Sequence, residues 1–227
     1  MSTWTEKEEL GNGIICYRGV IKKEFDLINK LENTLGSVAG YRELSPEGKR
    51  YHWQPAYVGY QQLMPEYRDC VDFKFKKTDI EKDKSEDSIK LQELWQDVYD
   101  AQAAVVEDYC RDYNIMTLKY WEAFNFVKYG PGQHFMEHHD HGYSYNCTVS
   151  IVSYINDDYE GGELYFRLQN LNIKPKAEDL YIFPSNFMYP HQAMPVHAGT
   201  KYSIVTMLDY SKKYHTPDMY NPKWDKE

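Results

Sequence analysis

The stretch YGPGQHFMEHHD, residues 129–140, decides how the rest of this chain is interpreted. It ends with His138, His139 and Asp140, so an imidazole and a carboxylate lie two residues apart. Residues i and i+2 of a β-strand point to the same face, so we expect His138 and Asp140 to aim at one point while His139 faces away. With a second imidazole they would form the 2-His-1-carboxylate face that holds non-haem Fe(II) and leaves coordination positions open.

Two histidines towards the end of the chain are candidates for that second imidazole. His191 and His197 both lie in the segment YPHQAMPVHAGTKYS, residues 189–203. A jelly roll can bring a late strand beside an early one, so the distance along the chain from His138 is no obstacle. His139 and His141 flank the first pair and are expected to be structural residues that face away from it.

The hydrophobic pattern around this stretch becomes strand-like after Leu118. Short apolar runs separated by turns are typical of β-strands. The expected strands are 118–129, 133–140, 146–155, 162–167, 171–174, 179–183, 187–192 and 201–208. Eight short strands in succession favour a closed double sheet over a parallel α/β sheet. The predicted fold is therefore an all-β core with N-terminal helices, a double-stranded β-helix or jelly roll at residues 118–209.

The preceding residues, 1–117, are predicted to be a helical and loop region that supports this core. Leu91, Leu94 and Val98 begin an apolar stripe on a long helix, which should pack against a sheet. The expected elements are strands at 14–17 and 56–63, helices at 22–35 and 88–113, and an exposed charged linker at 77–87. The whole chain, 1–227, is predicted to be one domain with a polar tail at 210–227.

Residues 37–87 combine many tyrosines and prolines with a charged end. Long loops of this kind often serve as lids or binding loops. We therefore hypothesise that part of this segment forms a mobile lid over the metal-binding face.

Composition and charge exclude several classes of partner. The net charge of −9 argues against a nucleic-acid or anionic-membrane surface. No apolar run approaches the roughly 20 residues of a membrane span, and the N-terminus lacks the basic head and apolar core of a secretory signal. The 4 cysteines are far apart and form no CxxC pair, so they are expected to be free thiols in a reducing compartment. These observations predict a cytoplasmic protein.

Several fragments together resemble the iron(II)- and 2-oxoglutarate-dependent dioxygenases, specifically their prolyl 4-hydroxylase-like branch. The matching residues, in chain order, are Tyr129, Gly132, Phe135, His138, Asp140, Tyr154, Ile155, Gly161, Gly162, Glu163, His191, Pro195, Val196, Gly199 and Lys201. Each fragment alone is weak, but their order and spacing are specific. The resemblance covers about 118–209, leaves 37–87 outside it, and favours His191 over His197.

The resemblance also implies roles for these residues. His138, Asp140 and His191 would bind Fe(II), and 2-oxoglutarate would chelate the metal as cosubstrate, with ascorbate as a further candidate cofactor. The distal carboxylate of 2-oxoglutarate would enter the barrel, where a buried carboxylate must be paired. Lys201 is its implied basic partner. Tyr154, and Tyr129 beside it, match other residues of the cofactor pocket.

By the same resemblance, the chain is expected to use molecular oxygen and to hydroxylate a substrate C–H bond, most simply that of a peptidyl proline. Cys147 stands where the branch carries an Arg implicated in substrate contact. A free amino acid, another peptide side chain or a small metabolite therefore remain alternative substrates. A nucleic-acid demethylase is disfavoured, because no Arg follows Arg167. A non-catalytic, cupin-like metal-binding protein is the alternative outside the enzymes.

Overall fold

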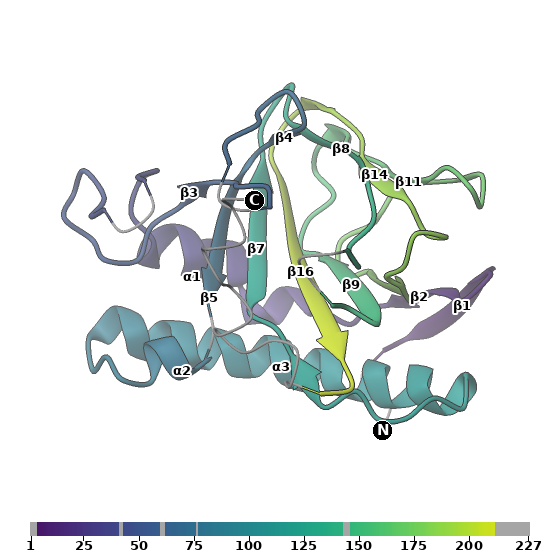
Figure 1. The fold of residues 1–227 in the computed structure, drawn as a ribbon. Coiled ribbons are helices and arrows are strands. Elements are labelled where there is room, and N and C mark those ends of the chain that lie inside the picture. Colours follow the sequence, from purple (N-terminus) through teal and green to yellow (C-terminus); the bar gives the residue numbers. More distant parts are fainter. Residues whose placement is uncertain (1–3, 41–42, 60–61, 76, 143–145, 212–227) are drawn as a thin grey trace, which may run out of the picture.

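Two β-sheets face each other, and helices cover the outer side of the larger sheet (Figure 1). The computed structural model describes residues 4–40, 43–59, 62–75, 77–142 and 146–211. This arrangement is the predicted jelly roll with N-terminal helices.

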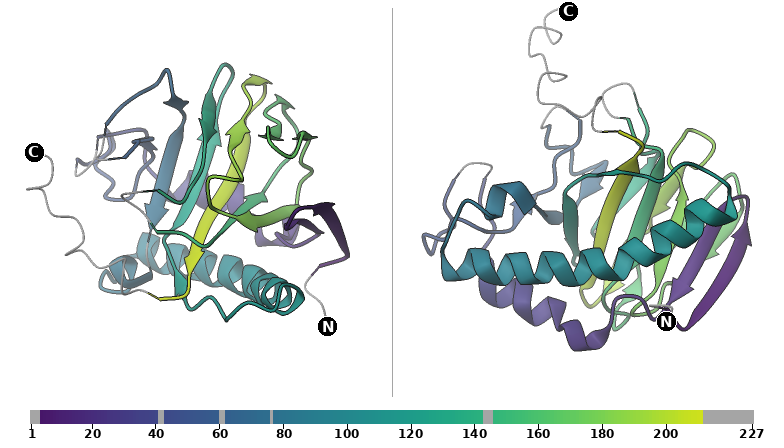
Figure 2. Two further views of the ribbon diagram at one scale, coloured as in Figure 1. Left: turned by 45° about the vertical axis from the view of Figure 1, so that its right-hand side comes forward. Right: turned by 90° about the horizontal axis from the view of Figure 1, so that it is seen from below.

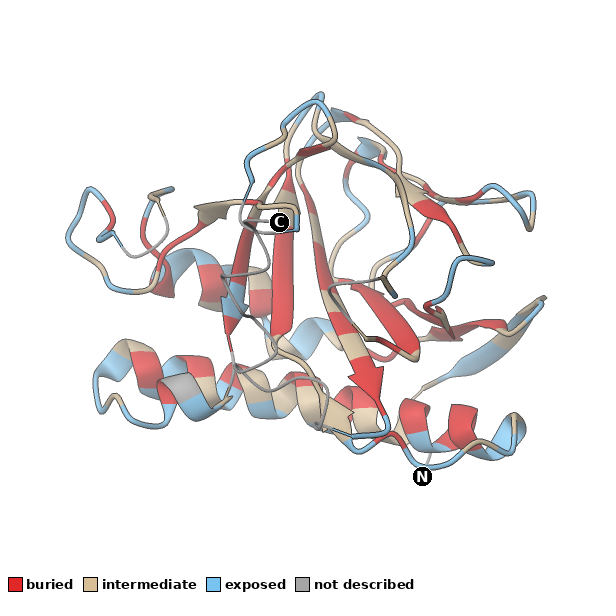
Figure 3. Cartoon of the chain, in the orientation of Figure 1, coloured by how far each residue is buried: buried red, intermediate tan, exposed pale blue. Residues whose placement is uncertain are grey.

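The larger sheet has nine strands in the order β1-β2-β13-β9-β16-β7-β5-β3, and β6 pairs with β16 beside that path. Its strands are β1 (Glu6–Gly11), β2 (Ile14–Arg18), β3 (Gln54–Pro55), β5 (Val71–Phe75), β6 (Tyr120–Trp121), β7 (Phe124–Tyr129), β9 (Val149–Tyr154), β13 (Leu180–Pro184) and β16 (Lys201–Asp209). The central strands β9, β16 and β7 are antiparallel neighbours, and most of their residues are buried (Figure 3).

The smaller sheet has five strands in the order β12-β11-β14-β8-β4. They are β4 (Arg68–Asp69), β8 (His134–His138), β11 (Leu164–Phe166), β12 (Leu171–Ile173) and β14 (His191–Ala193). A separate pair joins β10 (Glu160–Gly161) to β15 (Val196–Ala198).

Within the described residues the two sheets do not close into a barrel, so the expectation of a closed double sheet is wrong in this respect. The chain passes from β4 in the smaller sheet to β5 in the larger one at Cys70. The two sheets are therefore joined here by the chain itself, and no hydrogen bonds pair the described strands β4 and β5 as a closed barrel would require.

Strands from the N-terminal region enlarge both sheets beyond residues 118–209. The strand predicted at 14–17 is confirmed as β2, which pairs with β13. The strand predicted at 56–63 is wrong, because β3 ends at Pro55. Pro55 lies at the sheet edge, where its missing N–H breaks no ladder. Residues 1–117 therefore supply sheet as well as helix.

The helices are 3-10 helix η1 (Lys23–Phe25), α1 (Leu27–Thr34), α2 (Lys77–Ile80) and α3 (Glu86–Asp112). The long helix predicted at 88–113 is confirmed as α3, which runs under the larger sheet (Figure 2). Ser85 caps α3 by accepting a hydrogen bond from the backbone N–H of Ser88, which satisfies one of the free donors of the first turn. The charged stretch predicted as an exposed linker instead contains α2, because Ile80 is buried in the core.

Alternation along β16 separates the two faces of the larger sheet. Ile204 and Leu208 pack in the core that includes α3. Lys201, Ser203 and Val205 point the other way, into a cavity between the sheets. Among the described residues no helix is long and apolar enough to cross a membrane.

Candidate metal and cofactor site

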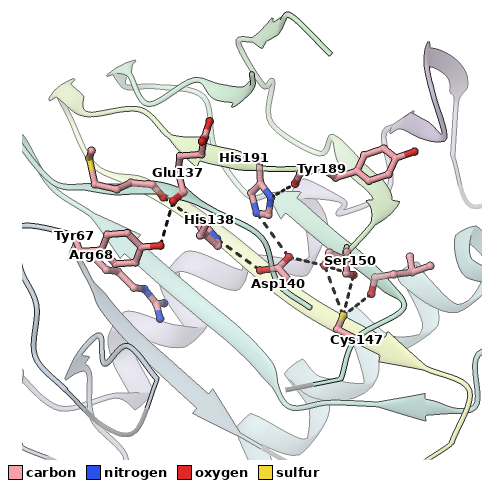
Figure 4. Close-up of polar contacts among 12 residues, drawn as sticks. Tyr67, Arg68, Glu137, His138, Asp140, Cys147, Ser150, Tyr189 and His191 are labelled. Atoms are coloured by element: carbon pink, nitrogen blue, oxygen red, sulfur yellow. Dashed lines mark hydrogen bonds and ion pairs between the residues drawn. The ribbon is translucent and has the colours of Figure 1, made fainter. Parts of the chain in front are cut away.

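Three predicted side chains meet where the two sheets face each other. His138, Asp140 and His191 each bring one potential ligand atom to within 4.8 Å of the others (Figure 4). Nε2 of His138 lies 3.6 Å from Oδ1 of Asp140, and Nε2 of His191 lies 3.7 Å from Oδ2. His138 and His191 are opposite one another in the β8–β14 register, which places the early and late histidines side by side. By contrast, His197 is exposed on β15.

Both imidazoles are held with Nε2 free to bind. Nδ1 of His138 lies 2.8 Å from the carbonyl of Met136, and Nδ1 of His191 lies 3.1 Å from the carbonyl of Tyr189. A carbonyl only accepts, so each Nδ1 carries an N–H, and in the neutral imidazole the lone pair is then on Nε2. Burial and the nearby His191 lower the pKa of His138 to about 3, so that imidazole is neutral and need not lose a proton to bind a metal.

The carboxylate of Asp140 is fixed by a buried chain of hydrogen bonds. Ser150 Oγ donates to Asp140 Oδ2 at 2.5 Å, and Ser150 and Ser185 share a hydrogen bond of 2.7 Å. Cys147 Sγ lies 3.0 Å from Ser185 Oγ (Figure 4). Burial raises the pKa of Cys147 to about 12, so it is a protonated thiol. Cys147 thus belongs to the support of Asp140, unlike the substrate-contacting Arg that the family resemblance places there.

The three side chains open onto a cavity of about 770 Å³, a volume that includes its open mouth. Its wall carries the three predicted cofactor residues, Tyr129, Tyr154 and Lys201. The cavity therefore joins the histidines and Asp140 to the predicted cofactor pocket in one continuous space.

Lys201 is a buried cation whose only hydrogen bond within the described part of the chain goes to a backbone carbonyl. It is 1% exposed, its Nζ donates to the carbonyl of Gly162 at 3.1 Å, and it lies 4.5 Å from the ring centre of Tyr129. Among the described residues no carboxylate forms an ion pair with it. Burial lowers its pKa to about 8. A buried ammonium without a counter-charge is costly, so this end of the cavity is suited to an anion.

Gly162 makes room for that side chain. Its φ is +68°, and an added Cβ would lie 3.2 Å from Cδ of Lys201. A larger residue would be strained there and would press on the lysine.

Arg68 is a cavity residue that the sequence pattern did not indicate. It lies in the segment predicted as a lid, yet it is 8% exposed and part of β4. Its guanidinium forms an ion pair of 3.1 Å with Asp72 and lies 4.9 Å from the ring centre of Phe135. The Phe135 ring in turn stacks on His138, with ring centres 3.6 Å apart. The i,i+4 spacing of Arg68 and Asp72 is a helical signal and does not predict this ion pair, which joins β4 to β5.

Comparisons with known proteins agree with this geometry. Residues 124–208 match the family model described as the 2OG-Fe(II) oxygenase superfamily. A protein of Acanthamoeba polyphaga mimivirus named "Putative prolyl 4-hydroxylase" is 30% identical over 118 residues, which cover 43% of this chain and 48% of that protein. The chain thus spans about half the length of this curated relative.

Two solved structures share the fold. A prolyl hydroxylase from Trichoplax adhaerens, in complex with a hypoxia inducible factor peptide fragment, gives a TM-score of 0.61 at 14% identity, covering 87% of this chain and 83% of that one. A prolyl-4-hydroxylase of Pseudomonas putida gives 0.53 at 16% identity, covering 86% and 92%. These likenesses confirm the predicted fold class.

Proposed function

We propose that this chain, whose residues 124–208 belong to the 2OG-Fe(II) oxygenase superfamily, is a dioxygenase that hydroxylates a peptidyl proline. The family uses Fe(II) and 2-oxoglutarate. Proline as the target is supported by the mimivirus relative, whose name is that of a prolyl 4-hydroxylase. In this proposal 118–209 is the catalytic core and 1–117 supports it within one domain.

The metal ligands in this proposal are His138, Asp140 and His191. Two imidazole nitrogens and one carboxylate oxygen are the donor set that suits Fe(II) and leaves positions open. When bound, the iron supplies the redox chemistry that couples oxygen and 2-oxoglutarate to C–H hydroxylation. The protein's part is to hold the three ligands rigidly, which the carbonyls behind the imidazoles and Ser150 behind Asp140 accomplish.

The observation that carries the cofactor assignment is Lys201. It is a buried cation without a carboxylate partner among the described residues, and it lines the same cavity as the three candidate ligands. A diacid that reaches from the metal to Lys201 would neutralise it. Tyr129 and Tyr154 would flank the distal carboxylate, since the Lys201 ammonium lies 4.5 Å and 6.0 Å from their ring centres.

Two further parts of the proposal concern the setting of the enzyme. We place it in the cytoplasm, with ascorbate as an added reductant; the four cysteines, all buried and unpaired, support a reducing compartment. The lid proposal keeps the loops of 37–87, since β3, β4, β5 and α2 belong to the sheets and helices. Limited proteolysis with and without metal, 2-oxoglutarate and peptide tests it, and unchanged cleavage within 37–87 would remove it.

The deciding experiment incubates the protein aerobically with Fe(II), 2-oxoglutarate and a panel of acetylated, amidated hexapeptides containing proline, with free L-proline alongside. Succinate release and a gain of one oxygen atom in a peptide are expected. Gain of oxygen by free proline alone would move the substrate to an amino acid. A metal-loaded protein that releases no succinate would favour the non-catalytic, cupin-like alternative.

Asp140→Ala is the matched control for that experiment. Its turnover should fall about 10³-fold or more, because the metal loses one of three ligands. The thermal unfolding temperature should stay near that of the wild type, because Asp140 lines a cavity and not the apolar core. An Asp140→Ala protein with wild-type Fe(II) affinity would show that the metal assignment is wrong.

A further inference from the structure

The wall of the cavity extends along β7 from Tyr129 to Asn125 and carries unpaired polar atoms. Asn125 on β7 is 8% exposed, lines this cavity, and its Oδ1 is buried without a hydrogen-bond partner. Nε of Arg68, on the same cavity wall, is also buried without an acceptor. Buried polar groups are normally hydrogen-bonded, so such atoms facing a cavity indicate a ligand that is to satisfy them.

Alternation along β7 confirms the direction of Asn125. Phe124 and Phe126 belong to the core that includes α3, whereas Val127 and Tyr129 line the cavity. Asn125 lies on the same face as the latter pair.

The cosubstrate is too short to reach Asn125. In the β7–β16 register Lys201 is opposite Tyr129 and Val205 is opposite Asn125. Four residues of strand separate the two levels by about 13 Å. A five-carbon diacid has four C–C bonds of about 1.5 Å and spans at most about 6 Å. A diacid anchored at Lys201 therefore ends near the middle of the cavity, and Asn125 is left to the substrate.

The charges at this end favour a neutral ligand group. Glu122, on the cavity wall near Asn125, is a half-buried carboxylate and not a cation. Lys74, opposite Asn125 on β5, is exposed to solvent. A free amino acid would bring a carboxylate that has no unpaired buried cation to meet it.

We propose that Asn125 binds a backbone amide of a peptide substrate, next to the residue that is hydroxylated. A peptide unit presents an N–H, which complements the unpaired acceptor of Asn125. This inference rests on the proposed function and deepens it, because it selects peptides over free amino acids and places their recognition on β7.

The test measures peptide binding by calorimetry to protein loaded with Mn(II) and N-oxalylglycine, which mimic the metal and the cosubstrate without turnover. The probes are the proline hexapeptides of the panel above. Asn125→Leu should weaken binding of the best peptide roughly tenfold, because it removes a buried hydrogen bond at little change in size. Replacing the contacted amide by an ester should weaken wild-type binding by a similar factor and should leave binding to Asn125→Leu nearly unchanged.

Thr206→Val is the matched control. Thr206 also has a buried Oγ1 without a partner, but it lies on the opposite face of the larger sheet. It should bind the peptide like the wild type, and both variants should unfold cooperatively near the wild-type temperature.

Equal peptide affinity of Asn125→Leu and wild type would overturn the inference, as would a wild-type protein that binds none of the peptides. Succinate release separates this result from the proposed function. A protein that releases succinate with free proline and binds no peptide keeps the dioxygenase and loses Asn125 as a peptide site. A protein that binds peptide through Asn125 and never releases succinate keeps Asn125 as a peptide site and loses the dioxygenase.

Discussion

Two buried cations line the same cavity and differ in one respect. Arg68 on β4 is 8% exposed and has Asp72 as an ion-pair partner at 3.1 Å. Lys201 on β16 is 1% exposed and has a backbone carbonyl as its hydrogen-bond partner, with no described carboxylate within ion-pair distance. The first charge is satisfied by the fold itself. The second has no counter-charge among the described residues, which supports it as the proposed site for an anion.

The pKa values of Arg68 and Lys201 are shifted in opposite directions. Burial acts to lower the pKa of Arg68, but surrounding groups that include Asp72 outweigh it and the pKa is raised. Burial of Lys201 is not compensated, and its pKa is lowered to about 8. A buried cation in this protein therefore shows by its partner whether it serves stability or binding.

Removing the paired cation should have the largest effect. Arg68→Met leaves Asp72 as an unpaired buried carboxylate, so the free energy of unfolding should fall by about 3–5 kcal/mol in urea titrations. The double variant Arg68→Met/Asp72→Asn should recover most of this loss, since no charge is then stranded. An Arg68→Met protein as stable as the wild type would show that pairing with Asp72 does not make Arg68 a stabilising cation.

The same substitution at the unpaired cation should affect binding and leave stability intact. Lys201→Met should raise the dissociation constant for 2-oxoglutarate about a hundredfold or more, because the bound carboxylate loses its partner. Anaerobic titration of the Fe(II)-loaded protein measures this. The free energy of unfolding should be equal to or above that of the wild type. If Lys201→Met binds 2-oxoglutarate normally, the anchor lies elsewhere, with Tyr154 and Tyr129 the next residues to test.

A change that keeps the charge should have a smaller effect. Lys201→Arg should weaken 2-oxoglutarate roughly tenfold, between the wild type and Lys201→Met, because a planar fork must fit a pocket packed against Gly162. Fe(II) affinity should not change. Binding as weak as that of Lys201→Met would show that shape at this position matters more than charge.

The smallest expected effect is a dependence on pH. Lys201 is charged below its lowered pKa of about 8 and neutral above it. Affinity for the dianionic cosubstrate should therefore be flat with respect to this group below pH 8 and should fall above it, by up to about tenfold per pH unit. Titrations from pH 7 to 9.5 measure the slope. Lys201→Arg stays charged throughout and should lose that slope, whereas an equal slope in both proteins would assign it to another group.

Much of the fold and of the candidate site follows from local pattern. The strand-like runs after Leu118 and the apolar stripe from Leu91 predicted the jelly roll and α3, because alternation and helical spacing act within a few residues. The predicted ends of the strands were less accurate. The hydrophobic pattern predicted one strand at 187–192, whereas β14 begins at His191, after Phe187 and Met188 in an exposed turn.

The sequence by itself indicated which residues are candidates for the chemistry. The two-residue repeat of a strand predicted that His138 and Asp140 approach one another, but β8 ends at His138 and Asp140 reaches the site from the bend that follows, so the predicted strand at 133–140 ends too late. The ten-residue spacing from His191 to Lys201 can also be read from the sequence. In the structure these two residues begin β14 and β16. Their assigned roles as ligands and anchor remain predictions.

Only the tertiary structure decided which of these residues meet and which atoms are left without partners. His191 reaches His138 because β14 pairs with β8 in one particular register, and Arg68 enters the cavity because a segment read as loop adds β4 to that sheet. The unpaired states of Lys201 and Asn125 depend on every neighbour that packs around them. Strand pairing and burial join residues far apart in the chain, so no local pattern can specify them.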